Sequence, residues 1–302
     1  MKKSLFYLIL ILLSTFLNAN EKVVLQLKWF HQFQFAGYYA AKEKGFYDEV
    51  GLDVQIKERD LKYNNIDEVI NGNAQYGVAD SILILYRLKQ QPVVIVSPIF
   101  QHSPSVFISL KKSNISSVYE LNNKDILFYP NDTDGFSLLA MIKKFDLDVN
   151  LIRERYKDDY MRLINNEVDA MPAYIANEPF LLKEKGYDVN IINPNNYGFD
   201  IYGDMLFTNE DEAKNYPIRV EKFKKATLKG WKYALENKEE IIQLISEKYS
   251  KEKSIEHLRY EANAIDSLID KDVTPLGYLD EGRIRYISEM YKYYGLTEST
   301  ID

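Results

Sequence analysis

The sequence of 302 residues contains no cysteine, only 3 histidines and only 2 tryptophans. The absence of cysteine excludes disulfides, cysteine-ligated zinc or iron–sulfur centres and a thiol nucleophile. A basic cluster is also absent, and 38 basic against 45 acidic residues give a net charge of −7, which argues against nucleic acid as a partner. By contrast, 24 tyrosines and 15 phenylalanines supply an aromatic surplus that suits packing and ligand stacking better than metal chemistry.

Motifs of catalysis are missing as well. The three histidines, His31, His102 and His257, lack the spacing of a metal site, and the sequence has no nucleophile elbow, no P-loop and no zinc-peptidase motif. We therefore predict no metal and no cofactor.

The N-terminal residues have the pattern of a secretory signal peptide. A basic start at residues 1–3 precedes an apolar run at residues 5–17, and a small polar exit follows around Ala19. The run is shorter than the roughly 20 residues that a membrane-spanning helix needs. We expect residues 1–19 to be a signal peptide that directs the chain to the periplasm; the alternative is an uncleaved membrane anchor.

Strands and helices alternate over the first hundred residues. Apolar and alternating segments predict strands, and segments with helical periodicity predict helices between them. The run at residues 93–96 is continuously apolar, which is typical of a buried parallel strand. This order predicts a doubly wound α/β fold. The predicted strands are residues 23–29, 51–56, 76–79 and 93–96, and the predicted helices are residues 35–44, 65–71 and 82–88.

A second α/β unit follows, and a helical segment ends the chain. The length alone favours about two domains. We predict lobe 1 from residues 20–101 plus 203–302 and lobe 2 from residues 102–202, with the ligand bound in the cleft between them. The later predicted strands are residues 105–110, 126–129, 168–171 and 189–192, and the later predicted helices are residues 135–145, 160–165, 175–185, 217–236, 239–249 and 279–294.

Four segments carry a resemblance to a known family: LKWFHQFQFAGYYAA at residues 27–41, YGVADS at 76–81, NEPF at 177–180 and YGFDIYGDMLF at 197–207. The chain resembles the periplasmic solute-binding proteins related to thiamine pyrimidine synthase, with sulfonate- and taurine-binding proteins as more distant relatives. The resemblance implies the type II periplasmic-binding-protein fold, in which two lobes close on a ligand.

Four candidate ligand residues lie in the first half. Trp29 follows the first strand, where it can stack on a planar ligand; the alternative is a core position. His31 is a weaker candidate, since lone histidines are more often surface or satisfied core groups. Asp80 and Ser81 combine a carboxylate and a hydroxyl at a helix start, although Asp80 can also be an N-cap only.

Six further candidates lie in the second half. The resemblance implies that Glu178 accepts hydrogen bonds from an exocyclic amine of the ligand; the alternative is a solvated carboxylate. If the helix predicted at residues 175–185 already starts at Tyr174, Tyr174 and Asn177 share one of its faces. The remaining candidates flank the second crossing between the lobes and are Tyr197, Tyr202 and Asp204.

The rival class is the enzyme of the family, the pyrimidine synthase. The resemblance implies a lysine that holds pyridoxal phosphate and a histidine donor, but these positions fall on Ala79 and Leu83. Neither side chain can form a Schiff base or donate an imidazole. We therefore predict a protein that is not an enzyme.

The predicted function is that of a monomeric periplasmic binding protein that delivers a small aminopyrimidine-like ligand to the permease of an ABC importer. Lobe closure around the ligand is the expected mechanism. Two alternatives stay open: a synthase-like protein of thiamine biosynthesis, and a ligand sensor that signals to a partner protein.

Overall fold

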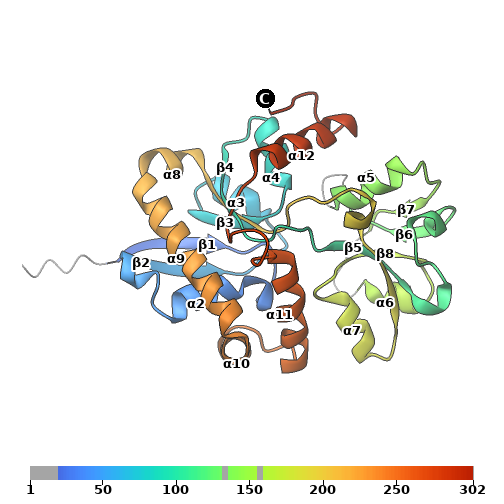
Figure 1. The fold of residues 1–302 in the computed structure, drawn as a ribbon, viewed down its shortest axis with the longest axis horizontal. Coiled ribbons are helices and arrows are strands. Elements are labelled where there is room, and N and C mark those ends of the chain that lie inside the picture. Colours follow the sequence, from blue (N-terminus) through green and yellow to red (C-terminus); the bar gives the residue numbers. More distant parts are fainter. Residues whose placement is uncertain (1–19, 131–134, 155–158, 302) are drawn as a thin grey trace, which may run out of the picture.

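The computed structural model describes residues 20–130, 135–154 and 159–301. The expected signal peptide, residues 1–19, lies outside the described residues. The elements form two groups, one around a five-stranded sheet and one around two smaller sheets, and they lie left and right in Figure 1. Among the described residues, none of the helices is long and apolar enough to cross a membrane.

The five-stranded sheet has the strand order β2-β1-β3-β10-β4. β1 pairs with β2 and β3 in parallel. β10, which follows the second group of elements in the sequence, is antiparallel to both β3 and β4. The expectation of a buried parallel strand at residues 93–96 was therefore wrong. β4 is an edge strand, and Val94, Ile95 and Val96 are only partly buried. The strands are β1 (Glu21–Gln26), β2 (Leu52–Lys57), β3 (Tyr76–Ala79), β4 (Val93–Pro98) and β10 (Met205–Asn209).

Helices cover this sheet, and the closest contact between helices is made through glycines. A Cβ atom on Gly230 would lie 2.2 Å from the carbonyl oxygen of Gly37, so only glycine permits α2 and α9 to approach this closely. The helices are α2 (Ala36–Glu43), α3 (Asn65–Ile70), α4 (Ile82–Leu88), α8 (Glu210–Asn215), α9 (Pro217–Glu236), α10 (Lys238–Lys248), α11 (Ile255–Ile269) and α12 (Glu281–Tyr293).

The second group is built on an antiparallel sheet, β8-β5-β9, beside a parallel pair, β6-β7. A bridge between Ile126 and Ala170 links the two. The strands are β5 (Ser105–Leu110), β6 (Asp125–Leu127), β7 (Asn150–Ile152), β8 (Met171–Tyr174) and β9 (Val189–Ile192), and the helices are α5 (Phe136–Lys144), α6 (Tyr160–Ile164) and α7 (Glu178–Glu184).

The helix predicted to start at residue 175 starts at Glu178. Tyr174 is instead the last residue of β8, so the expectation that it shares a helical face with Asn177 was wrong. The physical reason is the pairing of this segment with β5, in which Tyr174 lies opposite Ser105. The later start places Pro179 in the first turn of α7, where the missing N–H of proline has no helical partner to lose.

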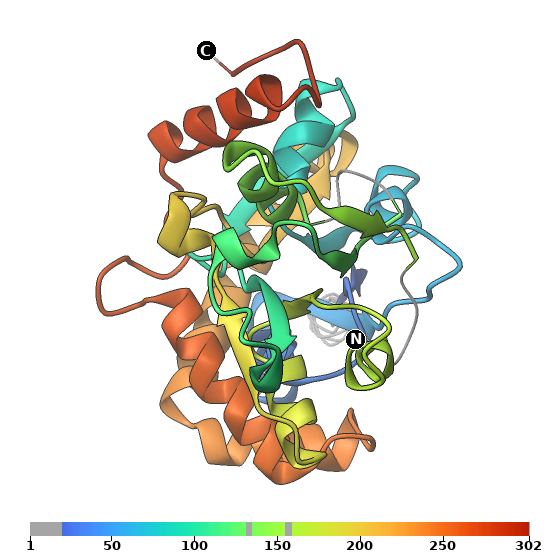
Figure 2. The ribbon, with the colours of Figure 1, turned by 90° about the vertical axis from the view of Figure 1, so that its right-hand side faces the viewer.

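Two crossing segments connect the groups and lie side by side. The amides of Ile99 and Phe100 both donate to the carbonyl oxygen of Asp204, at 2.8 and 3.0 Å, and the amide of Gly203 donates back to Phe100 at 3.1 Å. A Cβ atom on Gly203 would lie 2.7 Å from the carbonyl oxygen of His102, so glycine permits this contact. Figure 2, in which the second group faces the viewer, shows α12 above and the helices around α11 below.

Candidate functional site

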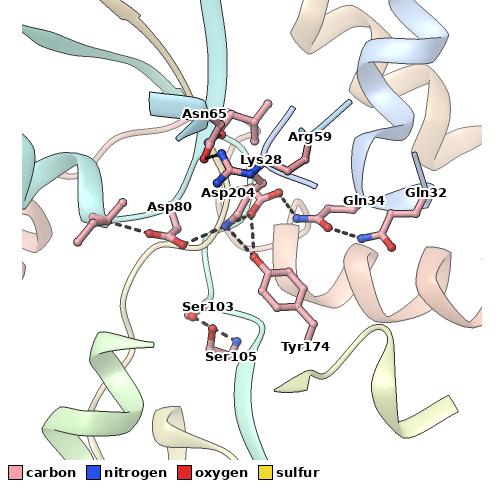
Figure 3. A network of polar contacts seen from close by, with 12 residues as sticks. Lys28, Gln32, Gln34, Arg59, Asn65, Asp80, Ser103, Ser105, Tyr174 and Asp204 are labelled. Carbon is pink, nitrogen blue, oxygen red and sulfur yellow. Dashed lines mark hydrogen bonds and ion pairs between the residues drawn. The ribbon is translucent and has the colours of Figure 1, made fainter. Parts of the chain in front are cut away.

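A buried lysine lies where the two groups meet. Lys28 follows β1, and its Nζ donates to Asp80 Oδ2 at 3.0 Å, to the Tyr174 hydroxyl at 2.9 Å and to Asp204 Oδ1 at 3.2 Å (Figure 3). The Tyr174 hydroxyl also donates to Asp204 Oδ1 at 3.1 Å. We call these four residues the Lys28 cluster. It joins the five-stranded sheet to β8 of the second group.

The sheet topology explains why these residues meet. β1 and β3 are parallel, so Lys28 and Asp80, which follow these strands, both lie at the carboxyl ends of the parallel strands. β10 runs in the opposite direction, and therefore Asp204, which precedes its first residue, lies at that end of the sheet as well. Tyr174 reaches the cluster from the end of β8.

Burial and charge oppose each other at Lys28. Its side chain is only 16% exposed, and that of Asp204 is 2% exposed. Burial alone would lower the pKa of Lys28, but the carboxylates of Asp204 and Asp80 outweigh this effect and raise the pKa well above its ordinary value. The cluster therefore holds an ammonium ion.

Two glutamines extend the cluster away from Lys28. The Gln34 amide donates to Asp204 Oδ2 at 2.7 Å, and the Gln32 amide donates to Gln34. A cavity of about 10 Å³, the room that one water needs, lies beside them. Its lining residues are Gln32, Gln34, Phe100, Tyr174, Ala176, Asn177, Glu261 and Ile265.

A second lysine contacts two of the residues that line this cavity, Asn177 and Glu261. Lys253 forms an ion pair with Glu261 of α11 and donates to Asn177 Oδ1 at 2.6 Å. The other oxygen of Glu261 accepts from the backbone amide of Phe33 at 2.8 Å. His257 Nε2 lies 3.6 Å from Glu261 Oε1. We call Lys253, Glu261, His257 and Asn177 the Lys253 cluster; like the first, it connects the two groups.

The structure brings three of the predicted site residues into direct contact through Lys28: Asp80, Tyr174 and Asp204. A fourth, Asn177, lines the same cavity as Tyr174. Asp80 lies one residue before the N-cap position of α4, which is Ser81, and also accepts from the amide of Ile82 at 3.0 Å, so it contacts both the helix start and Lys28. Ser81 beside it is buried and makes no side-chain cap at the start of α4.

Trp29 and His31 follow Lys28 in the chain. The indole of Trp29 is 41% exposed and packs edge-on against Phe30 at 5.3 Å between ring centroids. His31 Nδ1 lies 2.8 Å from the Tyr39 hydroxyl. Burial lowers the pKa of His31, against the opposing effect of Glu58. Trp29 thus offers an open aromatic face, whereas His31 is engaged with a core tyrosine.

Three other candidates have contacts of their own. Glu178 accepts from the backbone amide of Tyr174 at 2.7 Å and so fixes the end of β8. The Tyr197 hydroxyl accepts from the amide of Val118 at 3.3 Å. The Tyr202 hydroxyl accepts from the amide of Asp280 at 2.8 Å, at the start of α12. The hydrogen bonds of Tyr197 and Tyr202 connect the segments around the second crossing to Val118 and to the start of α12.

Sequence reasoning missed four residues of the site: Lys28, Gln32, Gln34 and Glu261. A signal existed for the first three, because they alternate with aromatic residues in the opening segment that carries the family resemblance. For Glu261 the signal was weaker: it lies four residues after His257 on a helix, a spacing that brings two side chains together.

The sequence pattern of the NMT1/THI5-like family matches residues 32–241. The chain belongs to the NMT1/THI5-like family. It is 25% identical to the riboflavin-binding protein RibY of Chloroflexus aurantiacus, over 74% of this chain and 65% of the relative. It is also 25% identical to the formylaminopyrimidine-binding protein of Halalkalibacterium halodurans, over 76% of this chain and 71% of the relative. The chain thus spans about two thirds of the length of each.

Solved structures establish the fold. The alkanesulfonate-binding protein SsuA of Xanthomonas axonopodis, bound to MOPS, superposes with a TM-score of 0.69 at 12% identity, covering 90% of this chain and 92% of that one. A Candida albicans protein described as having the generic periplasmic binding protein fold superposes with a TM-score of 0.65 at 13% identity, covering 94% and 92%. This member of the NMT1/THI5-like family therefore has the periplasmic-binding-protein fold.

Proposed function

We propose that the protein is a monomeric periplasmic binding protein that delivers an aminopyrimidine-like ring to the permease of an ABC importer. One observation carries this proposal: hydrogen-bond acceptors from both groups of elements meet at one point, as a ligand that closes two lobes requires. The family relationship and the named formylaminopyrimidine-binding relative support it. The leader pattern at residues 1–19 supports export.

The proposed lobes are residues 20–101 plus 203–302 and residues 102–202. The two crossing segments support these boundaries, since they pair through Phe100 and Gly203 between the sheets. The ligand would sit at this junction, where closure changes the distance between Tyr174 of the second lobe and Asp204 of the first.

The chemistry of the junction favours a ligand that donates hydrogen bonds. Asp204 is a buried carboxylate, and Asp80 presents a second one. An amino group on a ring supplies N–H donors for such acceptors, whereas a sulfonate would bring a negative charge toward them. The exposed face of Trp29 offers a stacking surface for the ring.

The synthase alternative has little chemical support. Ala79 ends β3 and Leu83 lies in α4, and both are buried and apolar where the synthase would need its lysine and histidine. The fold itself does not decide the matter, because a desulfurization enzyme superposes with a TM-score of 0.67. The side chains favour a carrier.

Calorimetry of the purified protein against formylated aminopyrimidines, thiamine precursors, riboflavin-like rings and taurine tests the proposal. We expect an aminopyrimidine to bind and the Trp29→Ala variant to lose about 0.5–1.5 kcal/mol of binding free energy, the contribution of an aromatic stack. Trp29→Phe is the matched control, because it keeps a ring. A heat of binding with taurine, together with no heat of binding for any aminopyrimidine, would refute the proposed ligand class.

A further inference from the structure

We propose that Asp80, Tyr174 and Asp204 form a subsite for a primary ammonium or amine group, and that Lys28 fills this subsite from within the chain until a ligand displaces it. The identity of the displacing ligand rests on the proposed function. The existence of the subsite does not, because simple ammonium ions can probe it.

The first argument is the match between donors and acceptors. A lysine ammonium carries three N–H donors, and Lys28 Nζ has three acceptors at 2.9 to 3.2 Å. The acceptors belong to different parts of the fold: Asp80 follows β3, Tyr174 ends β8 and Asp204 precedes β10. Figure 3 shows the three oxygens converging on the one nitrogen. Such convergence is the geometry of an ammonium-binding site.

The second argument is the asymmetry of burial. Asp204 is 2% exposed and forms the closed floor of the subsite, while Asp80 is 43% exposed and forms its open side. Lys28 reaches the floor on a flexible four-carbon stem. Its ammonium can therefore leave past Asp80 toward solvent, and an incoming amine can take the same acceptors without unfolding the sheet edge.

The third argument concerns closure. Through Lys28, Tyr174 of the second group is held to Asp80 and Asp204 beside the first. A primary ammonium group of a ligand has the donors for the same three bonds, and a ring amine has the donors for two of them; either would hold the same elements together. Lys28 thus competes with the ligand, and a competitor within the chain lowers the apparent affinity for the ligand by the fraction of time that it occupies the site.

The subsite is tested with Lys28→Ala, which empties it. Lys22→Ala in β1, the strand that precedes Lys28, is the matched control, because Lys22 is exposed. We expect methylammonium chloride to raise the melting temperature of Lys28→Ala by more than that of the control or the unchanged protein. Tetramethylammonium, which has the charge but no N–H donor, should not raise the melting temperature of any of these three proteins. Equal shifts in all proteins would overturn the subsite. Should Lys28→Ala fail to fold, Lys28→Gln serves the same comparison, since it keeps a polar side chain without the charge.

Displacement is tested on the unchanged protein by acetylation of lysine amines, read out by peptide mass spectrometry. Lys28 should react slowly alone and faster with a bound aminopyrimidine, while Lys22 keeps its rate. Slower or unchanged labelling of Lys28 with ligand bound would overturn displacement and would make Lys28 a direct ligand contact or a bystander. If no aminopyrimidine binds, the proposed function fails, yet the methylammonium result still decides the subsite.

Discussion

The two buried lysine clusters differ although they look alike. Lys28 and Lys253 each have a side chain that is 16% exposed, and each pairs with a carboxylate that is 2% exposed, Asp204 and Glu261 respectively. Both also contact the second group of elements. The difference lies in access from solvent: Lys28 has a second carboxylate partner, Asp80, that is 43% exposed, whereas the further partner of Lys253 is the amide oxygen of Asn177.

This difference shows that a lysine–carboxylate pair can have one of two roles: it can exchange its cation with a ligand, or it can hold two helices together. At Lys28 an outer acceptor gives an incoming amine access. Asp204 and Glu261 each have contacts on both oxygens, but Lys253 has Asn177 at the start of α7 as a further partner where Lys28 has the half-exposed Asp80. We infer that the Lys253 cluster holds α11 against α7 and that the Lys28 cluster exchanges its cation.

Breaking the Lys253 cluster should have the largest effect on stability. Lys253→Met leaves Glu261 buried without its ion-pair partner, and removal of one partner of a buried pair costs about 3–5 kcal/mol. We expect the free energy of unfolding, measured by urea denaturation, to fall by that amount. Lys251→Met is the control, because Lys251 is exposed and two residues away. Similar losses in both variants would mean that the pair does not stabilise the fold.

The Lys28 cluster should show a graded response to loss of its carboxylates. Asp204 accepts from Lys28, Tyr174 and Gln34, so Asp204→Ala leaves buried donors unpaired and should cost about 2–3 kcal/mol in urea denaturation. Asp80→Ala should cost less than about 1 kcal/mol, because its ion pair is close to solvent. The reverse order would contradict the open side assigned to Asp80.

The first of these clusters was partly predictable from sequence. Asp80 was recognised at the start of a predicted helix, and Asp204 beside the predicted second crossing between the lobes. Lys28 was missed because a lysine after a strand normally faces water; only its two carboxylate partners, 52 and 176 residues away, keep it buried.

The second cluster was harder to predict from the sequence. The sequence indicated a largely helical C-terminal segment but did not delimit α11 (Ile255–Ile269). Glu261 contacts Phe33, 228 residues earlier, through packing that no local pattern encodes. Similarly, the start of α7 was misplaced because the pairing of Tyr174 with Ser105 decides where β8 ends. Local periodicity thus identified elements, and long-range contacts decided their ends and their buried charges.

A smaller effect than the loss of either buried carboxylate contact is the pH dependence of stability that His257 gives to the Lys253 cluster. His257 packs against the ring of Phe180 and lies 3.4 Å from Lys253 Nζ and 3.6 Å from Glu261 Oε1. Burial, and secondarily the charge of Lys253, lowers the pKa of His257 from 6.5 to about 3. Between these two values the unfolded chain binds a proton that the folded chain does not, so stability falls as the pH falls.

We expect His257 to lower the free energy of unfolding by about 1 kcal/mol between pH 7 and pH 5, allowing for solvent screening, and His257→Gln to remove that loss in urea denaturation. His102 supplies a control of opposite sign, because its hydrogen bond with Asp200 raises its pKa. Its contribution is fully present below pH 6.5 and is lost as the pH rises through the raised pKa, so His102→Gln should steepen the acid loss. A loss that survives His257→Gln would place its origin in other titratable groups of the chain.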